Sequence, residues 1–237
     1  MLTKEEIEKI REKFKPKNWS ETKSEDSWSI FKIMGEFVNG YEKLAAIGPC
    51  VAIFGSARMH SDNKYYKMTE EIAYELTSRG FGVLTGGGPG IMEAGNKGAH
   101  EAGGHSVGLN IVLPHEQSCN PYIDHDKSID FNYFFTRKTM FSRYAQGFIV
   151  MPGGFGTLDE FFEALTLVQT DKIANFPIVL VGKSYWDGLM DWIQTKLIEE
   201  GTITESEIQL FKLVDTVEAA VNIVEDFYNK YALKLNF

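Results

Sequence analysis

Three glycines and a threonine follow a short apolar run near the middle of the chain, and their spacing predicts a phosphate-binding turn. The run covers residues 148–151, and after Pro152 the sequence reads GGFGTLDE. Glycines at such a turn let backbone N–H groups come close to a ligand. At a helix N-terminus, those N–H groups and the helix dipole both favour an anion. The glycines of the predicted turn are Gly153, Gly154 and Gly156, and Thr157 is a polar residue near the start of the helix.

Glu160 is the chemically unusual residue of this stretch, because it places a carboxylate one turn into the same predicted helix. A carboxylate repels phosphate, so we expect Glu160 to face the uncharged part of the ligand. The alternative is a surface residue that complements the helix dipole, which stabilises a helix by roughly 0.3–1 kcal/mol.

Basic residues precede the central apolar run in two places. Arg137 and Lys138 lie in the first turn of a predicted helix, where cations oppose the dipole, and this misplaced charge indicates a ligand. Ser56 and Arg58 follow the first clear strand, and the loops at strand carboxyl ends line the crevice of a doubly wound sheet. The alternative for Arg58, Arg137 and Lys138 is solvated surface charge.

A second glycine-rich turn, GGGPG at residues 86–90, lies between a predicted strand and a predicted helix. Its spacing is not G-x-G-x-x-G, and no acidic residue ends the second strand as a ribose ligand. A nicotinamide cofactor is therefore not expected, and we predict no cofactor at all. Close packing of the turn against the sheet would use the same glycines.

Apolar strands alternate with amphipathic helices along most of the chain, which predicts an α/β fold with a doubly wound parallel sheet and helices on both faces. The predicted strands cover residues 50–55, 81–85, 106–112, 129–135, 148–151 and 177–182. The predicted helices after the first strand include residues 63–79, 91–102, 185–200, 204–211 and 215–231.

Residues 1–47 precede the first strand and have helical periodicity, interrupted by a polar linker at 15–26. We predict an N-terminal helical extension at 1–47 and a nucleotide-binding catalytic domain at 48–237. The extension packs on the main domain or on a partner subunit, or it is a solvated structural arm.

Composition restricts the classes of partner. The 237 residues are 43% hydrophobic and carry a net charge of −9, so nucleic acid and acidic membrane surfaces are not expected partners. No apolar run approaches the roughly 20 residues that span a bilayer, and the charged N-terminus lacks a signal-peptide core, so we expect a cytoplasmic protein. Cys50 and Cys119 are too few and too far apart for a disulfide framework or a zinc site, and we expect free thiols and no metal.

Several of these segments together resemble the LOG family of cytokinin-activating nucleoside-monophosphate phosphoribohydrolases, whose members often carry the label lysine decarboxylase. The resemblance runs from about residue 51 to 177, and the sequence offers no convincing setting for the lysine of a pyridoxal-phosphate decarboxylase. It is carried by GGGPGIMEA at 86–94, LPHEQ at 113–117, TRKTM at 136–140, PGGFGTLDE at 152–160 and ALTLVQT at 164–170.

The resemblance implies a Rossmann-like fold without a dinucleotide, with Arg137 and Glu160 as the catalytic pair. It also implies that the glycine turn and Thr157 cradle a 5′-phosphate, that Glu116, Lys138 and Thr166 help to hold the nucleotide, and that the site is completed at a subunit contact. A homodimer or a higher homo-oligomer is therefore expected.

The expected reaction is hydrolysis of the N-glycosidic bond of a purine or cytokinin ribonucleoside 5′-monophosphate, which releases the free base and ribose 5-phosphate. Such bonds break through an oxocarbenium-like state. We expect Glu160 to stabilise that cation and orient water, and Arg137 to steady either the departing base or the phosphate. In the segment before Arg137, plant members have Met-His and this chain has Phe134-Phe135-Thr136, so the choice between cytokinin nucleotides and plain AMP stays open. The alternatives are an AMP nucleosidase without a hormone role and a non-catalytic nucleotide or cofactor carrier.

Overall fold

The computed structural model describes residues 3, 8, 19–113, 119–233 and 235–237. Contacts between residues divide the chain into two units, Met1–Asn39 and Gly40–Phe237. Helix α2, Trp19–Leu44, crosses that division. The predicted domain boundary between residues 47 and 48 stays a prediction, because contacts alone do not test independent folding.

The first unit contains most of α2, and the polar linker predicted at 15–26 is wrong from residue 19 onward, where the chain is already helical. Five large apolar side chains of α2 are exposed: Trp28, Ile30, Phe31, Met34 and Val38. Whether this extension packs on the rest of the chain or on a partner stays a prediction.

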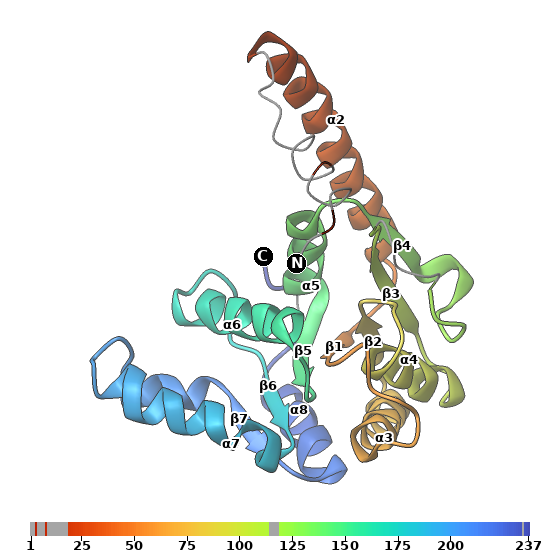
Figure 1. The fold of residues 1–237 in the computed structure, drawn as a ribbon. Helices are drawn as coiled ribbons and strands as arrows, with labels where there is room; N and C mark the ends of the chain where they lie inside the picture. The colour runs from red at the N-terminus through yellow and green to blue at the C-terminus, as the bar shows by residue number, and fades with distance from the viewer. Residues whose placement is uncertain (1–2, 4–7, 9–18, 114–118, 234) are drawn as a thin grey trace. The chain divides into compact units, whose positions relative to one another are not determined.

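The second unit is built on a seven-stranded sheet of order β4-β3-β2-β1-β5-β6-β7, in which all neighbouring strands are parallel (Figure 1). The chain fills the sheet from β1 outward to β4, then returns to β5 beside β1 and continues to β7. The strands are β1 Cys50–Phe54, β2 Gly82–Thr85, β3 Ser106–Ile111, β4 Ser128–Phe131, β5 Ala145–Val150, β6 Ile178–Val181 and β7 Lys212–Val214.

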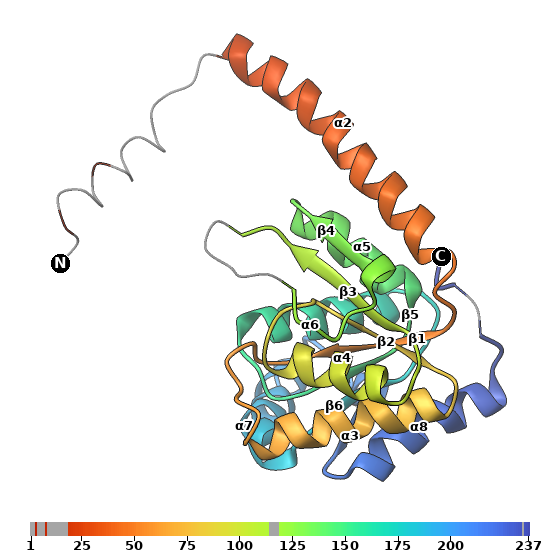
Figure 2. The same ribbon diagram turned by 90° about the vertical axis from the view of Figure 1, so that its right-hand side faces the viewer.

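Helices cover both faces of the sheet, and the predicted doubly wound α/β fold is confirmed. Helices α3, α4 and α8 lie together on one side, and α5 lies on the other (Figure 2). The helices are α3 Lys64–Ser78, α4 Ile91–Glu101, α5 Phe134–Tyr144, α6 Phe155–Gln169, α7 Lys183–Trp192 and α8 Val217–Lys230, with short helical turns η1 His125–Lys127, η2 Ile193–Ile198 and η3 Glu205–Leu210.

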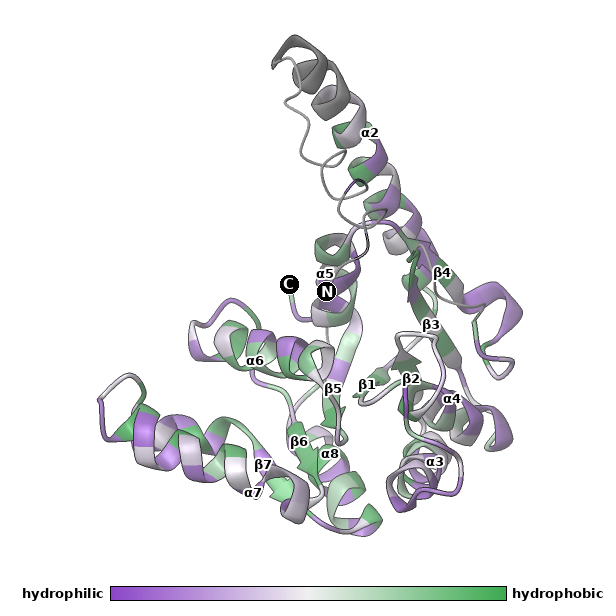
Figure 3. Ribbon diagram, in the orientation of Figure 1, coloured by the Kyte–Doolittle hydropathy of each residue, from purple (hydrophilic) through white to green (hydrophobic). Residues whose placement is uncertain are grey.

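Successive side chains of a strand point to opposite faces of the sheet, so each face has its own hydrophobic core. In β1, Val51 and Ile53 belong to the cluster that includes α3 and α8 residues, whereas the Phe54 ring packs on Phe141 and Phe148 at 4.9 Å. Strands β1, β2, β5 and β6 are buried throughout, as expected of parallel strands covered on both faces. In Figure 3, β2 and β6 are drawn mainly in the green of hydrophobic residues.

Other described features concern membranes, metals and thiols. The part of the chain that the structure describes has no helix of the length and apolarity needed to cross a membrane. Within the same residues, no three His, Cys, Asp or Glu side chains group as metal ligands. Both cysteines are free thiols, as predicted, and burial raises the pKa of Cys50 to about 12.

Candidate active site

The site lies where the direction of strand addition reverses, between β1 and β5, which is the usual ligand position in open α/β sheets. Ser56, just after β1, joins the two glycine-rich turns through its backbone. Its N–H donates to the Pro152 carbonyl at 3.0 Å, and its carbonyl accepts the Ile91 N–H at 3.1 Å. The loops after β1, β2 and β5 therefore meet at one edge of the sheet.

Two glycines make this close meeting possible. Gly90 has φ +69°, and a Cβ there would lie 2.4 Å from the Ser56 carbonyl oxygen. A Cβ on Gly153 would lie 2.1 Å from Thr157 Oγ1 and 3.0 Å from the Ser56 nitrogen. A side chain at either position would force the turns apart, so these glycines serve packing between the loops.

Gly154 and Gly156 serve a different purpose, because a Cβ on either would meet nothing within 4 Å. Both residues are exposed, and Gly154 is the residue that precedes α6. The first N–H groups of a helix have no acceptor within the helix, and Gly154 has no side chain to cap them. The turn therefore presents backbone donors to open space, with the buried Thr157 beside Gly153. This arrangement suits a phosphate group.

Glu160 lies one turn beyond Thr157 on the same side of α6, and its residue is only 5% exposed. Burial raises its pKa to about 7, while the positive charges of Lys138 and Arg137 act in the opposite direction. The neighbouring Glu163 and Asp159 carboxylates raise the pKa further. Glu160 is thus a buried acid that changes charge near neutral pH.

Arg137 approaches the same region from α5. Its guanidinium lies over the Phe134 ring at 5.4 Å and the Phe141 ring at 5.8 Å. A Cβ on Gly86 would lie 3.7 Å from Arg137 Nη1, so the side chain reaches the second glycine turn. The Arg137 charge also acts on Glu160 and lowers its pKa, so the two residues of the predicted catalytic pair interact electrostatically.

Lys138, the next residue, contacts α6. Its Nζ lies 2.9 Å from both Asp159 Oδ2 and Glu163 Oε2. Burial lowers the pKa of Lys138, but hydrogen bonds to these two carboxylates and the charge of Glu160 outweigh it, so the pKa is raised. Lys138, which was predicted to hold the nucleotide, is therefore ion-paired with the carboxylates that precede and follow Glu160 in the sequence.

The structure does not bring all predicted residues to this point. Thr166 is exposed and lies six residues, or about 9 Å of helix axis, beyond Glu160, with its hydroxyl donating to the Phe162 carbonyl at 2.8 Å. The exposed Arg58 donates its backbone N–H to Ser56 Oγ at 3.1 Å. Glu116 lies outside the described residues. Contacts of these residues with substrate stay predictions.

Sequence reasoning missed the side chains that hold the second glycine turn. Asn120 Nδ2 donates to the Gly87 and Gly88 carbonyls at 3.1 Å and to Asn96 Oδ1 at 2.9 Å. Thr85 Oγ1 accepts the Gly87 N–H at 3.0 Å and donates to Asn96 Oδ1 at 2.6 Å. Asn96 on the buried side of α4 was the available signal, because a buried amide requires polar partners.

The first glycine turn has a support of its own in α7. The Tyr185 hydroxyl donates to the Gly153 carbonyl at 2.7 Å. No sequence pattern connects residues 32 positions apart on different βα units, so this contact follows from the fold alone.

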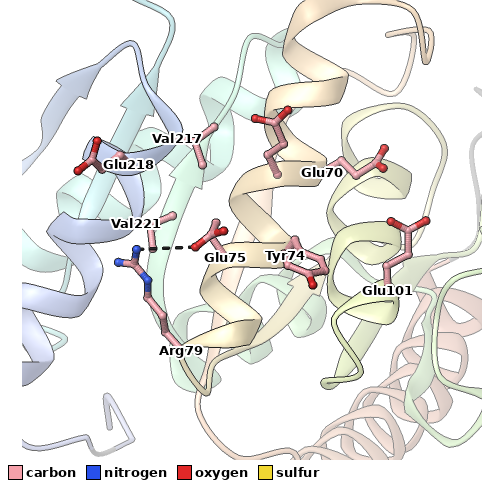
Figure 4. Close-up of a pocket in the computed structure, with 9 residues that line it drawn as sticks. Glu70, Tyr74, Glu75, Arg79, Glu101, Val217, Glu218 and Val221 are labelled. Atoms are coloured by element: carbon pink, nitrogen blue, oxygen red, sulfur yellow. Dashed lines mark ion pairs between the residues drawn. The ribbon is translucent and has the colours of Figure 1, made fainter.

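A cavity of about 630 Å³ lies elsewhere, among α3, α4 and α8 (Figure 4). Five glutamates dominate its wall, and its one arginine, Arg79, is paired with Glu75 at 3.8 Å and Glu225 at 2.7 Å. An acidic wall repels phosphate, so this cavity is not the predicted anion site. The lining residues are Glu70, Glu71, Tyr74, Glu75, Arg79, Glu101, Val217, Glu218 and Val221.

Residues 92–224, more than half of the chain, match a protein-family model described as "possible lysine decarboxylase". The chain belongs to this family, the LOG family. The matched residues include α5, the first glycine turn and α6, which contribute Arg137 and Glu160.

Curated relatives of the family carry a different description. The chain is 35% identical over 102 residues to a cytokinin riboside 5′-monophosphate phosphoribohydrolase of Mycobacterium tuberculosis, covering 41% of this chain and 52% of that protein. It is 33% identical over 92 residues to the Arabidopsis thaliana enzyme of that name, LOG4, covering 38% and 42%. The chain thus spans about half the length of the curated relatives it matches.

A solved structure supports the fold. The molybdenum cofactor carrier protein of Chlamydomonas reinhardtii superposes with a TM-score of 0.56 and 22% identity, covering 77% of this chain and 99% of that chain. At this identity the likeness concerns the fold alone.

Proposed function

We propose that the protein hydrolyses the N-glycosidic bond of purine ribonucleoside 5′-monophosphates and releases the free base and ribose 5-phosphate. The observation that carries this proposal is the buried Glu160 carboxylate, one turn beyond an open glycine turn and within the influence of Arg137. Family membership and the names of the curated relatives support the same class of reaction.

The glycine turn provides the phosphate subsite in this proposal. Backbone N–H groups at Gly154 to Thr157 bind the 5′-phosphate, and the open space around Gly154 and Gly156 admits it. Binding energy from the phosphate then positions the sugar, although the phosphate takes no part in bond breaking.

Glu160 acts on the sugar. The transition state places positive charge on the ribose, and a fixed carboxylate in a water-poor site stabilises that charge more than it stabilises the neutral ground state. Glu160 also orients the attacking water. Arg137 steadies the departing base or the phosphate, and its contact with the second glycine turn is compatible with both tasks.

The base of the substrate is either plain adenine or an N6-modified cytokinin. Phe134 and Phe135 are half-exposed at the start of α5, near Arg137, so an apolar substituent on the base has apolar surface available. Base release from AMP and from isopentenyladenosine monophosphate, measured side by side, decides between the two. Comparable kcat/KM values favour an AMP nucleosidase without a hormone role.

A nucleotide or cofactor carrier is the second candidate, because a solved structure of the same fold is named as a molybdenum cofactor carrier. A carrier has no use for a carboxylate buried beside its anion site. Tight nucleotide binding without release of base from any purine monophosphate would support the carrier and contradict the hydrolase.

Comparing AMP with adenosine tests the proposed phosphate subsite. We expect adenosine to have a far lower kcat/KM, because it lacks the group that binds the glycine turn. Equal values for the two compounds would remove this turn from the mechanism.

A further inference from the structure

Lys138 connects the two helices that carry the proposed catalytic pair. It is adjacent to Arg137 on α5, and its Nζ lies 2.9 Å from Asp159 and from Glu163 on α6. These carboxylates are four residues apart, so they lie on one side of α6, and they enclose Glu160 in the sequence. The Lys138 side chain is only 15% exposed.

We infer that Lys138 is a positioning residue. It holds the acidic residues of α6, Asp159, Glu160 and Glu163, against α5, and it keeps Glu160 available as a carboxylate at neutral pH. As far as catalysis is concerned, this inference rests on the proposed function. It differs from the role implied by resemblance, in which Lys138 holds the nucleotide directly.

The ion pairs of Lys138 are partly withdrawn from water: the side chain of Lys138 is 15% exposed, that of Glu163 34% and that of Asp159 59%. Exposed lysine–carboxylate pairs contribute little, because water screens them and the long side chains lose freedom. Lys138 is largely withdrawn from water and satisfies two carboxylates with its ammonium, which has three N–H donors. Moving Lys138 to a phosphate would leave Asp159 and Glu163 facing each other without that cation.

The charged groups around Glu160 influence whether its side chain is ionised. Arg137 and Lys138 reach it from α5, and Asp159 and Glu163 are its neighbours on α6. The cations favour the carboxylate form, and the two acidic neighbours oppose it. Lys138 therefore stabilises charged Glu160 by its own charge and by neutralising the acids on either side.

A ¹³C NMR titration of the Glu160 carboxyl in ligand-free protein tests the inference without using activity. The Glu160→Gln spectrum assigns the signal. We expect Lys138→Met to raise the measured pKa by about 0.5 or more, because a cation is lost. We expect Glu163→Gln to lower it, because an anion is lost while Lys138 stays charged.

Shifts of the Glu160 pKa in opposite directions are the decisive result, because both variants break the same ion pair between Lys138 and Glu163. If the pair served only to hold the fold, both variants would loosen the same contact and would shift the Glu160 pKa in the same direction or not at all. Either of those results overturns the inference. If Lys138→Met fails to fold, as judged by circular dichroism, a raised or unchanged pKa in Glu163→Gln still overturns it.

Lys97 supplies a matched control. It lies on α4 and also contacts two glutamates, Glu70 at 2.9 Å and Glu101 at 3.8 Å, both of which line the acidic cavity. Lys97→Met should leave the Glu160 pKa unchanged. Lys138→Arg keeps the charge and should restore a pKa close to that of the wild type.

Kinetics with AMP separate positioning from direct nucleotide contact. Positioning predicts that Lys138→Met lowers kcat, moves the acidic limb of the rate profile to higher pH and changes KM less than threefold. A KM increase of tenfold or more with an unmoved Glu160 pKa would instead assign Lys138 to the nucleotide. If the wild type releases no base, the proposed function fails, while the NMR titration still decides the role of Lys138.

Discussion

At the scale of single residues, Glu160 combines two properties that a purely structural residue would not need. It is buried, and the two cations of α5 act on it against the two carboxylates of its own helix. Burial outweighs the cations, so its pKa lies near 7, and its charge becomes sensitive to physiological pH.

The pH dependence of catalysis follows from this pKa. The proposed mechanism needs ionised Glu160, so kcat/KM for AMP should rise with pH through about 7 and then level. The second pKa of the AMP phosphate is about 6, so it lies below the pH range in which kcat/KM is expected to rise. A rate that falls as pH rises through 7 would assign Glu160 the role of a proton donor and contradict the carboxylate mechanism.

The same pKa predicts an effect on stability. A folded-state pKa raised above the ordinary value of 4.5 means that ionised Glu160 destabilises the fold, with no penalty below pH 4.5 and the full penalty above about pH 7. Glu160→Gln should therefore increase the free energy of unfolding by roughly 1–3 kcal/mol at pH 8.5 and change it little at pH 4.5. Denaturant unfolding at both values measures this, and an equal effect at the two would show that the charge is not responsible.

Residue types and motif spacing were sufficient to single out Arg137, Lys138 and Glu160 as candidates for the site. Arg137 was singled out because its charge opposes the dipole of its helix, and Glu160 because a carboxylate repels the phosphate predicted beside it. Their role as a catalytic pair came from the resemblance. The partners of Lys138 were not predictable, because they depend on how α5 and α6 meet across β5. The role of Asn120 was not predicted, because the local sequence does not distinguish it from the other polar residues of its loop.

At the scale of elements, neighbouring glycines of the turn before α6 have different roles. Gly153 faces Thr157 and Ser56 at distances too short for a Cβ, whereas Gly154 faces open space. One turn therefore contains a glycine required for packing and a glycine required for access.

Substitutions at these positions should have different consequences. Gly154→Val should fold normally and raise KM for AMP by tenfold or more, because its side chain occupies the space for the phosphate. Gly153→Ala should lower the melting temperature, because its Cβ meets backbone and Thr157. Circular dichroism and steady-state kinetics measure both effects. A Gly154→Val protein that folds and keeps the wild-type KM would contradict the phosphate subsite.

The long apolar strands and their following helices were predictable from sequence, and the short elements were not. Strand β7 has only three residues and forms by pairing with β6, so no pattern indicated it within the segment predicted as helix and connection. The strand predicted at 129–135 ends at Phe131, and Phe134 already begins α5. The helix predicted at 185–200 changes to a π-helix at Ile193. Aromatic side chains fit both helix and strand, and tertiary contacts decide between them.

At the scale of the whole molecule, the sheet order places the loops after β1, β2 and β5 together, although they are far apart in sequence. The site opens where Phe155 is 92% exposed and where Phe134 and Phe135 are half-exposed. Exposed aromatic surface next to a site is compatible with a subunit contact.

We accordingly propose a homodimer or a higher homo-oligomer. Light scattering after size exclusion should give a molar mass of at least twice the 26.8 kDa of one chain at micromolar concentration. A value of one chain mass in a preparation that releases base from AMP would show that one subunit suffices for the site.

The central claim is that Glu160 acts by its charge on the ribosyl cation, and Glu160→Gln tests it most directly. Calorimetric titration with AMP and a base-release assay are performed on the wild type, on Glu160→Gln and on Glu218→Gln, a control in the first turn of α8. We predict that Glu160→Gln binds AMP at least as tightly as the wild type and loses about 10²-fold or more in kcat, while Glu218→Gln matches the wild type. Near-wild-type turnover by a Glu160→Gln protein that binds AMP would contradict the mechanism.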